Sequence, residues 1–176
     1  MMKGAVLKDI VYAKGANFSG ANLTGADFSN SNLANAVFKD AILDGVDFSG
    51  ANLSGVDFSS LSIRKANFKG ANLRGTIFKR SDLSGSILTE CDRLDKTNFY
   101  RANCIGCDFS NSNLKYAEFQ KAKLEDSNFN NCILARANFS KADLHRTIMS
   151  DSNMTNVILN ATTATKTVFT ESTMIN

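Results

Sequence analysis

A five-residue period in the large apolar side chains constrains the fold of this 176-residue chain more than any other feature. From Phe18 to Leu88 a large apolar residue stands at every fifth position, and after one six-residue step to Leu94 the period continues, with few exceptions, to Met174. All 13 phenylalanines lie on this lattice. Neither the 3.6-residue repeat of a helix nor the two-residue alternation of a long strand produces such a period. The period instead predicts short strands separated by corners.

The residues around each lattice position, called i, show how one unit is built. Position i−2 is usually small, as at Ala16 and Ala21, and position i−1 is mostly Asn or Asp. Because alternate residues of a strand point to the same side, i−2 and i both face inward while i−1 faces outward. Positions i+1 and i+2 then turn the corner, and glycine is frequent at i+2, where it tolerates a positive φ.

Several stretches carry this unit in its purest form: Ala16-Asn17-Phe18-Ser19-Gly20, Ala21-Asn22-Leu23-Thr24-Gly25 and Ala26-Asp27-Phe28-Ser29-Asn30. The chain resembles the pentapeptide-repeat family, and the resemblance extends over almost its whole length. The resemblance implies an all-β fold, a right-handed quadrilateral β-helix or solenoid with four pentapeptide units per coil. At about 4.8 Å per coil, about eight coils give a rod roughly 38 Å long.

The alternation of Phe and Leu along the lattice independently supports four sides, because it puts Phe columns on two opposite faces and Leu columns on the other two. One predicted core column contains Phe18, Phe38, Phe58, Phe78, Phe99, Phe119 and Phe139. The opposite column contains Phe28, Phe48, Phe68, Leu88, Phe109, Phe129, Met149 and Phe169. Aromatic rings stacked in this way favour offset packing.

The two parts of the chain differ in regularity. Residues 1–15 are interpreted as degenerate N-terminal repeats or a cap, with Ala5, Leu7, Ile10 and Tyr12 facing inward, and residues 16–176 as the β-helix proper. We interpret the six-residue step as a one-residue insertion in the segment 89–93.

The insertion has two interpretations. The first is a bulge that the fold tolerates without further consequence. The second is a bend or a presented loop carrying Glu90, Asp92 and Arg93, since bulges re-aim side chains next to sites.

The C-terminal end is apolar and carries little charge. After Asp151 only Lys166 and Glu171 are charged, and no helical cap follows. An uncapped strand edge favours association. The sequence therefore predicts a homodimer through the C-terminal coil, with fraying of the last residues as the other interpretation. The candidate dimer end comprises Ile158, Leu159, Val168, Phe169 and Met174.

Four cysteines, Cys91, Cys104, Cys107 and Cys132, include a C-x-x-C pair, a spacing that zinc and redox sites use. The lattice, however, directs Cys104, Cys107 and Cys132 into the core, where cysteine acts as a small apolar residue. We expect four reduced thiols, no metal site and no cofactor-binding site.

Catalytic residues are not expected. The only histidine, His145, falls on a corner at i+1, and a core filled by side chains leaves no pocket for a nucleophile, a base and an orienting group. The chain is therefore predicted not to be an enzyme.

The charge of the chain indicates which kinds of partner it can bind. The net charge is +3, and the basic residues of segment 64–80 are Arg64, Lys65, Lys69, Arg74, Lys79 and Arg80. Since each unit turns a corner, these side chains are predicted to form a girdle around one coil. Binding along a nucleic acid needs aligned charges, so we do not expect a nucleic acid as the partner, and binding through this girdle is the weaker hypothesis.

The preferred function is a non-catalytic protein–protein interaction or scaffolding rod of unknown partner. The family resemblance implies another: a DNA mimic that binds type II topoisomerase (gyrase) and gives fluoroquinolone resistance. A mimic requires a strongly negative surface, whereas this chain is positive. No membrane association is expected. The expected location is the cytoplasm, or the thylakoid lumen or periplasm if a targeting segment was removed.

Overall fold

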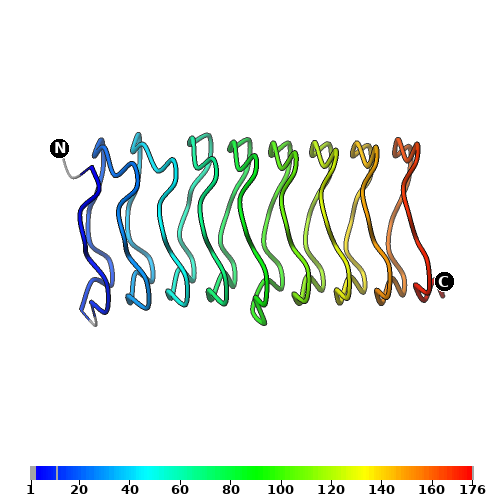
Figure 1. Cartoon of the computed structure of the whole chain (residues 1–176), viewed down its shortest axis with the longest axis horizontal. Coiled ribbons are helices and arrows are strands. Elements are labelled where there is room, and N and C mark those ends of the chain that lie inside the picture. Colours follow the sequence, from blue (N-terminus) through cyan, green and yellow to red (C-terminus); the bar gives the residue numbers. More distant parts are fainter. Residues whose placement is uncertain (1–2, 11, 176) are drawn as a thin grey trace.

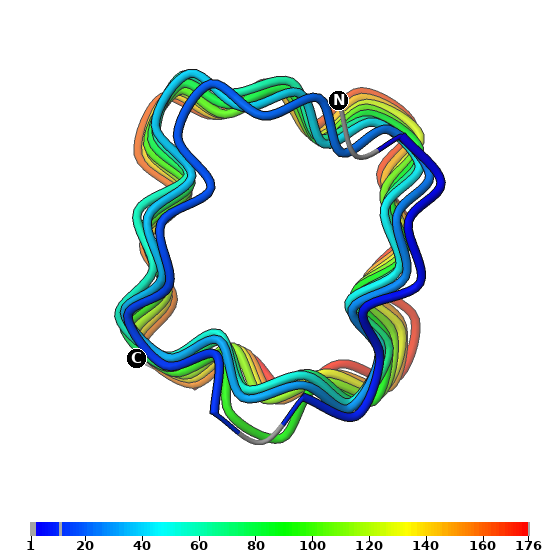
Figure 2. The same cartoon turned by 90° about the vertical axis from the view of Figure 1, so that its left-hand side faces the viewer.

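The chain winds into a straight rod with its two ends far apart (Figure 1). The computed structural model describes residues 3–10 and 12–175. Over these residues there is no helix, and the strands are so short that each appears as an isolated parallel bridge at position i−1. Bridges join Asn17 to Val37 and Asn22 to Ile42, residues 20 apart, so that four five-residue units make one coil. The outline seen along the rod is four-sided (Figure 2).

Backbone hydrogen bonds between coils follow the five-residue unit. The N–H of Phe18 donates to the carbonyl of Val37 at 2.7 Å, and the N–H of Gly20 donates to that of Lys39 at 2.8 Å. In the opposite direction the N–H of Val37 donates to the carbonyl of Ala16 at 2.9 Å. This pattern repeats along the rod and satisfies the backbone groups that burial would otherwise penalise. An unbroken series of bridges on one face runs from Val6 to Val168. The number of coils, estimated at about eight, depends on how the incomplete terminal coils are counted.

The corners explain the polar residues of the repeat. Residues at i+2 have left-handed φ angles, as at Gly20 with φ of 68°. The Asn or Asp at i−1 accepts a hydrogen bond from the N–H at i+1: Asn17 Oδ1 accepts from Ser19 at 2.9 Å, and Asp57 Oδ1 accepts from Ser59 at 2.8 Å. These side-chain bonds fix the corner as Asx turns do.

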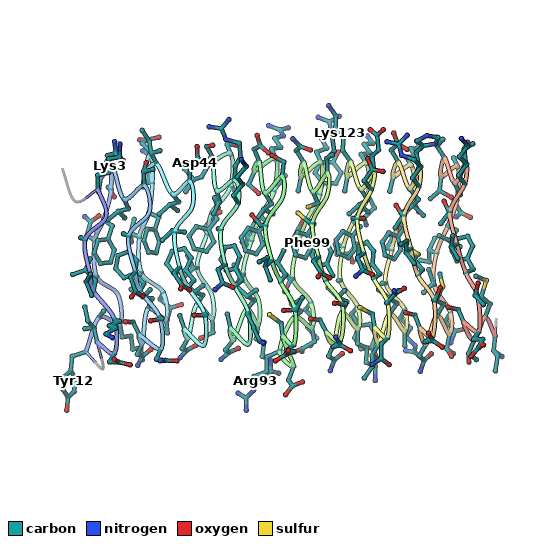
Figure 3. All side chains as sticks on the ribbon, in the orientation of Figure 1. Lys3, Tyr12, Asp44, Arg93, Phe99 and Lys123 are labelled. Atoms are coloured by element: carbon teal, nitrogen blue, oxygen red, sulfur yellow. The ribbon has the colours of Figure 1, made fainter. Side chains whose placement is uncertain are left out.

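Side chains fill the interior from opposite faces. Within one column the rings stack nearly parallel, with centroids 4.6 Å apart for Phe99 and Phe119 and 4.6 Å apart for Phe109 and Phe129. Between the columns they meet edge to face, as Phe99 and Phe109 do at 5.5 Å and 88°. The terminal members Phe18 and Phe169 are only partly buried. Figure 3 shows the Phe99 side chain within the rod, with Arg93 and Lys123 outside it.

The chain contains two one-residue insertions at the same corner. One lies between Leu7 and Ala13 and the other between Leu88 and Leu94, and each lengthens a bridge spacing to 21 residues (Val6 to Asp27, and Asn72 to Arg93). Seen along the rod, the corner of the second insertion (green) projects beyond the four-sided outline (Figure 2).

The first insertion corrects the prediction for Tyr12. Its side chain is 94% exposed, and Ala13 takes the inward position instead. An extra residue separates Ile10 from the inward Ala13, in a stretch whose position 11 is outside the described residues. It shifts every later residue by one place, so that Tyr12 occupies the outward i−1 position.

At both insertions a serine hydroxyl of the next coil is hydrogen-bonded to the backbone. At the second, Asp92 is the extra residue and Cys91 still points inward. The hydroxyl of Ser112, one coil further on, donates to the carbonyl of Leu88 at 2.7 Å and accepts from the N–H of Cys91 at 3.0 Å. Ser31 does the same for Leu7 and Ile10 at the first insertion. The same pair of bonds occurs at Ser86 and Ser152, where no residue is inserted, so it is a general property of serine at i−2.

Candidate functional site

The four cysteines lie in the core and are unpaired with one another. Burial raises the pKa of the Cys91 and Cys132 thiols to about 12, and it also raises the pKa of Cys104, next to Cys107. The sulfurs of Cys91, Cys107 and Cys132 each donate to a backbone carbonyl; Cys107 Sγ, for example, donates to Leu83 at 3.0 Å. A thiol that stays protonated is a poor nucleophile and a poor metal ligand.

We expect all four thiols to be titrated by a disulfide reagent in denaturant and to react slowly in the native protein, because burial keeps them out of reach of the reagent. Thiol counting under both conditions, with elemental analysis for zinc, is the measurement. Fewer than four thiols in denaturant, or rapid reaction in the native state, would contradict it.

The residue types that enzyme sites commonly use are not grouped together in the described part of the chain. His145 lies at a corner, where its backbone N–H donates to Asp143 Oδ1 at 3.1 Å. Among residues 3–10 and 12–175, no three His, Cys, Asp or Glu side chains are grouped as metal ligands would be. The same residues contain no helix with the length and apolarity needed to cross a membrane.

One side of the rod concentrates positive charge. We define the basic face as residues 74–80, 95–101, 115–121 and 135–141, which are four consecutive coils of one side from one corner to the next. Nine basic and two acidic residues give it a net charge of +7, against +3 for the whole chain. The basic residues are Arg74, Lys79, Arg80, Lys96, Arg101, Lys115, Lys121, Arg136 and Lys141; the acidic ones are Asp95 and Glu118.

The cations of the basic face lie along its two edges, since they occupy the corner positions i+1 and i+2. The central row between them is formed by the outward i−1 residues, which bridges join in consecutive coils. This row is Ile77, Asn98, Glu118 and Asn138. The face therefore has two basic edges and a central strip that contains two amide side chains, one apolar side chain and one acidic side chain.

A tyrosine lies within each basic edge. Lys79 and Lys121, from the coils on either side, approach the Tyr100 ring at 5.6 and 5.7 Å from its centroid, and Arg101 approaches it at 5.4 Å. On the other edge, Lys115 and Arg136 approach Tyr116 at 5.3 and 5.8 Å. Such contacts hold cations beside one another on an aromatic ring.

Desolvation acts to raise the pKa of Tyr100, but contact with Lys121 and the charges of Arg101, Lys121 and Arg80 lower it overall. This direction is the one expected in a positive local potential.

The charges of the basic face are largely uncompensated. Within the described chain, its one ion pair joins Arg74 to Asp95 at 3.6 Å. At the next corner, by contrast, Arg146 Nε lies 2.6 Å from Asp126, and Arg64 pairs with Asp44. The hydrogen bond from Arg146 lowers the pKa of Asp126. Apart from Arg74, no cation of the basic face has an ion-pair partner within the described residues.

The girdle predicted from the sequence contains only part of the basic face. Arg74, Lys79 and Arg80 belong to the basic face, whereas Arg64 and Lys69 lie at other corners, paired with Asp44 and Glu90. The predicted girdle is therefore divided among corners, and half of it joins an aligned patch. The signal that would have found this patch is charge read at steps of 20 or 21 residues, the coil spacing.

The C-terminal end forms a second exposed surface. A hollow of about 510 Å³ there is lined by Met154, Val157, Ile158, Leu159, Asn160 and Met174. Met174 is 52% exposed, Ile158 40% and Val168 42%, and Leu159 and Phe169 are half-buried. The N–H of Met149 donates to Val168 in the next coil, whereas the described residues supply no acceptor for the N–H of Phe169. The described end thus presents apolar side chains beside a strand edge.

These observations define a class: a repeat protein whose interior is filled by its own side chains and whose exposed faces are flat β-surfaces. Two family models match it, a pentapeptide repeat region over residues 14–88 and pentapeptide repeats (8 copies) over residues 93–131 and 122–160. The chain belongs to the pentapeptide-repeat family. The predicted family and β-helical class are thereby confirmed.

Solved structures of the family are similar at low identity. Rfr23 from the cyanobacterium Cyanothece 51142 is 25% identical with a TM-score of 0.38, over 61% of this chain and 63% of that one. HetL from Nostoc sp. strain PCC 7120, involved in heterocyst differentiation regulation, is 19% identical with a TM-score of 0.32, over 88% and 83%. Full-length QnrB1, a plasmid-mediated fluoroquinolone resistance protein, is 21% identical with a TM-score of 0.37, over 92% of each chain. No curated protein matches the sequence significantly.

Proposed function

We propose that this protein is a non-catalytic rod that binds another protein through a flat face and pairs with a second copy of itself through its C-terminal coil. The observation that carries the proposal is the rod's construction. Its core is closed by stacked phenylalanines, so that recognition falls to its outer surface. Rigid hydrogen-bonded faces also lose little conformational entropy on binding.

Self-association through the C-terminal end is supported by what that end exposes. Apolar side chains around Met174 and Leu159 lie beside a strand edge with few charges. Such an edge pairs readily with another chain. A two-fold arrangement closes both copies, whereas a head-to-tail contact would continue into fibres.

Capture of a partner tests the proposal. The full chain is immobilised and exposed to nuclease-treated lysate of its source cell. One protein should be retained in a saturable, stoichiometric amount. Retention only from lysate that has not been treated with nuclease, or retention of no protein in stoichiometric amount, would contradict protein binding.

We also propose a cytoplasmic location, with the lumen of the thylakoid or the periplasm as the other possibility. Four buried cysteines without a disulfide fit a reducing compartment. Fractionation of source cells with an antibody to the chain decides between them.

A second candidate function is inhibition of gyrase by DNA mimicry. We expect an assay for this activity to show no inhibition. We expect no half-inhibition of gyrase supercoiling at low micromolar protein. Gyrase binds a polyanion, whereas this rod has a net charge of +3 and a face with +7, so like-signed surfaces would repel. A supercoiling assay with relaxed plasmid is the measurement, and inhibition in that range would support the mimic instead.

A further inference from the structure

We propose that the basic face is the docking surface for an acidic surface of a protein partner. The inference rests on the proposed protein-binding function and adds which face binds and what chemistry the partner presents. The partner's patch is expected to carry Asp and Glu side chains around a less charged centre, complementary to the two basic edges.

The cations of the basic face are aligned along the rod. Successive coils lie about 4.8 Å apart, so Arg80, Arg101, Lys121 and Lys141 form a row along one corner of the rod. No acidic residue occupies that corner in these four coils. None of the four takes part in an ion pair within the described residues. Charges arranged in this way steer an oppositely charged partner and increase its association rate.

The backbone positions of these cations set where their side chains leave the corner. Arg80, Arg101 and Lys121 have φ angles of 59°, 57° and 60°, in the left-handed region. The i+2 residue of other corners, such as Ser60 or Ala161, has the same conformation, so it belongs to the corner and not to the cation.

The composition of the face favours a protein over a nucleic acid. The rings of Tyr100 and Tyr116 are engaged by neighbouring cations, which hinders them from stacking unpaired bases. A duplex lying along the centre of the face would bring phosphates toward Glu118. The centre of the face carries one charge, Glu118, and Arg and Tyr, which both occur on its edges, are enriched in protein–protein interfaces.

The size of the face suits a salt-sensitive contact. Four coils span about 14 Å along the rod, and the five residues from one edge to the other span about 15 Å. This area is small beside the surface buried in permanent complexes, so electrostatics should dominate its binding.

The test uses the full chain and fluorescent poly-L-glutamate as an acidic polypeptide probe, with anisotropy measured over a series of salt concentrations. The face variant combines Arg101→Glu with Lys121→Glu. The matched control combines Lys65→Glu with Lys166→Glu, which changes the same charge at equivalent left-handed corner positions elsewhere. Circular dichroism and melting confirm that both variants fold.

We expect binding that weakens as salt rises, a loss of affinity of about tenfold or more in the face variant, and a change under about threefold in the control. An equal loss of affinity in both variants would show that only net charge matters and would overturn the proposal. Failure of the unaltered chain to bind the probe would overturn it as well. Tighter binding of a duplex DNA of matched charge, or of vesicles containing anionic lipid, with the same loss in the face variant would also overturn it in favour of that partner.

Partner capture separates this inference from the proposed function. If the face variant still retains the captured protein, the rod binds protein through another surface and only this inference fails. If the unaltered chain retains no protein, the proposed function fails, whatever the probe shows.

Discussion

Replacement Phe58→Ala should lower the free energy of unfolding by about 3–5 kcal/mol. The Phe58 side chain is fully buried in the middle of its column. Its ring lies 5.2 Å from that of Phe38 and 5.3 Å from that of Phe78, centroid to centroid. Because coils above and below fix the rod's width through their own hydrogen bonds, the cavity cannot easily collapse. Chemical denaturation followed by circular dichroism gives the free energy.

The control for this prediction is Ile42→Ala, which removes an outward apolar side chain that is 46% exposed. A surface change of this kind should alter stability by under about 1 kcal/mol. Similar effects of the two replacements would mean that the Phe column is not tightly packed.

The five-residue period was sufficient to predict short strands separated by corners, because each unit repeats the same inward and outward pattern, and the resemblance of these units to pentapeptide repeats implied the β-helical fold. Phe18, Asn17 and Gly20 have physical roles that a single unit already reveals: core, corner bond and left-handed turn. Local chemistry and global fold agree in almost every unit, which makes such a sequence readable.

The exceptions lay where local signals were ambiguous. The run Ile10-Val11-Tyr12-Ala13 is apolar throughout, so the sequence alone offers more than one register. The structure places Ala13 inward and Tyr12 outward because one extra residue separates Ile10 from Ala13. The second insertion was easier to locate, since Leu88 and Leu94 are unambiguous core residues on either side of it.

The basic face was missed for a different reason. Its cations lie about one coil apart in sequence, so a search for neighbouring charges finds only fragments such as Lys79 and Arg80. Their ion-pair partners, or lack of them, also depend on contacts between coils, as the pairing of Arg64 with Asp44 shows. A one-dimensional period of five predicts the rod, whereas its surface is organised by the period of 20 or 21.

Replacing Phe169 and Met174 with Lys should convert a C-terminally paired dimer into a monomer. Both side chains belong to the last coil; Met174 is 52% exposed, and Phe169 is half-buried with no coil beyond it. Two lysines from each copy would meet across a two-fold contact, where like charges repel and apolar burial is lost. Light scattering coupled to size exclusion, at tens of micromolar protein, measures the mass of the unaltered chain and the variant.

The matched control is Ile148→Lys, which adds a lysine at an outward face position with 40% exposure, one coil before Val168. It should leave the dimer intact, because the side of the rod is not expected to take part in end-to-end pairing. Since lysine at Phe169 weakens the last coil itself, the single variant Met174→Lys is measured as well, and it should raise the dissociation constant by about tenfold or more. A monomeric unaltered chain, or equal dissociation by Ile148→Lys, would rule out pairing through the C-terminal coil.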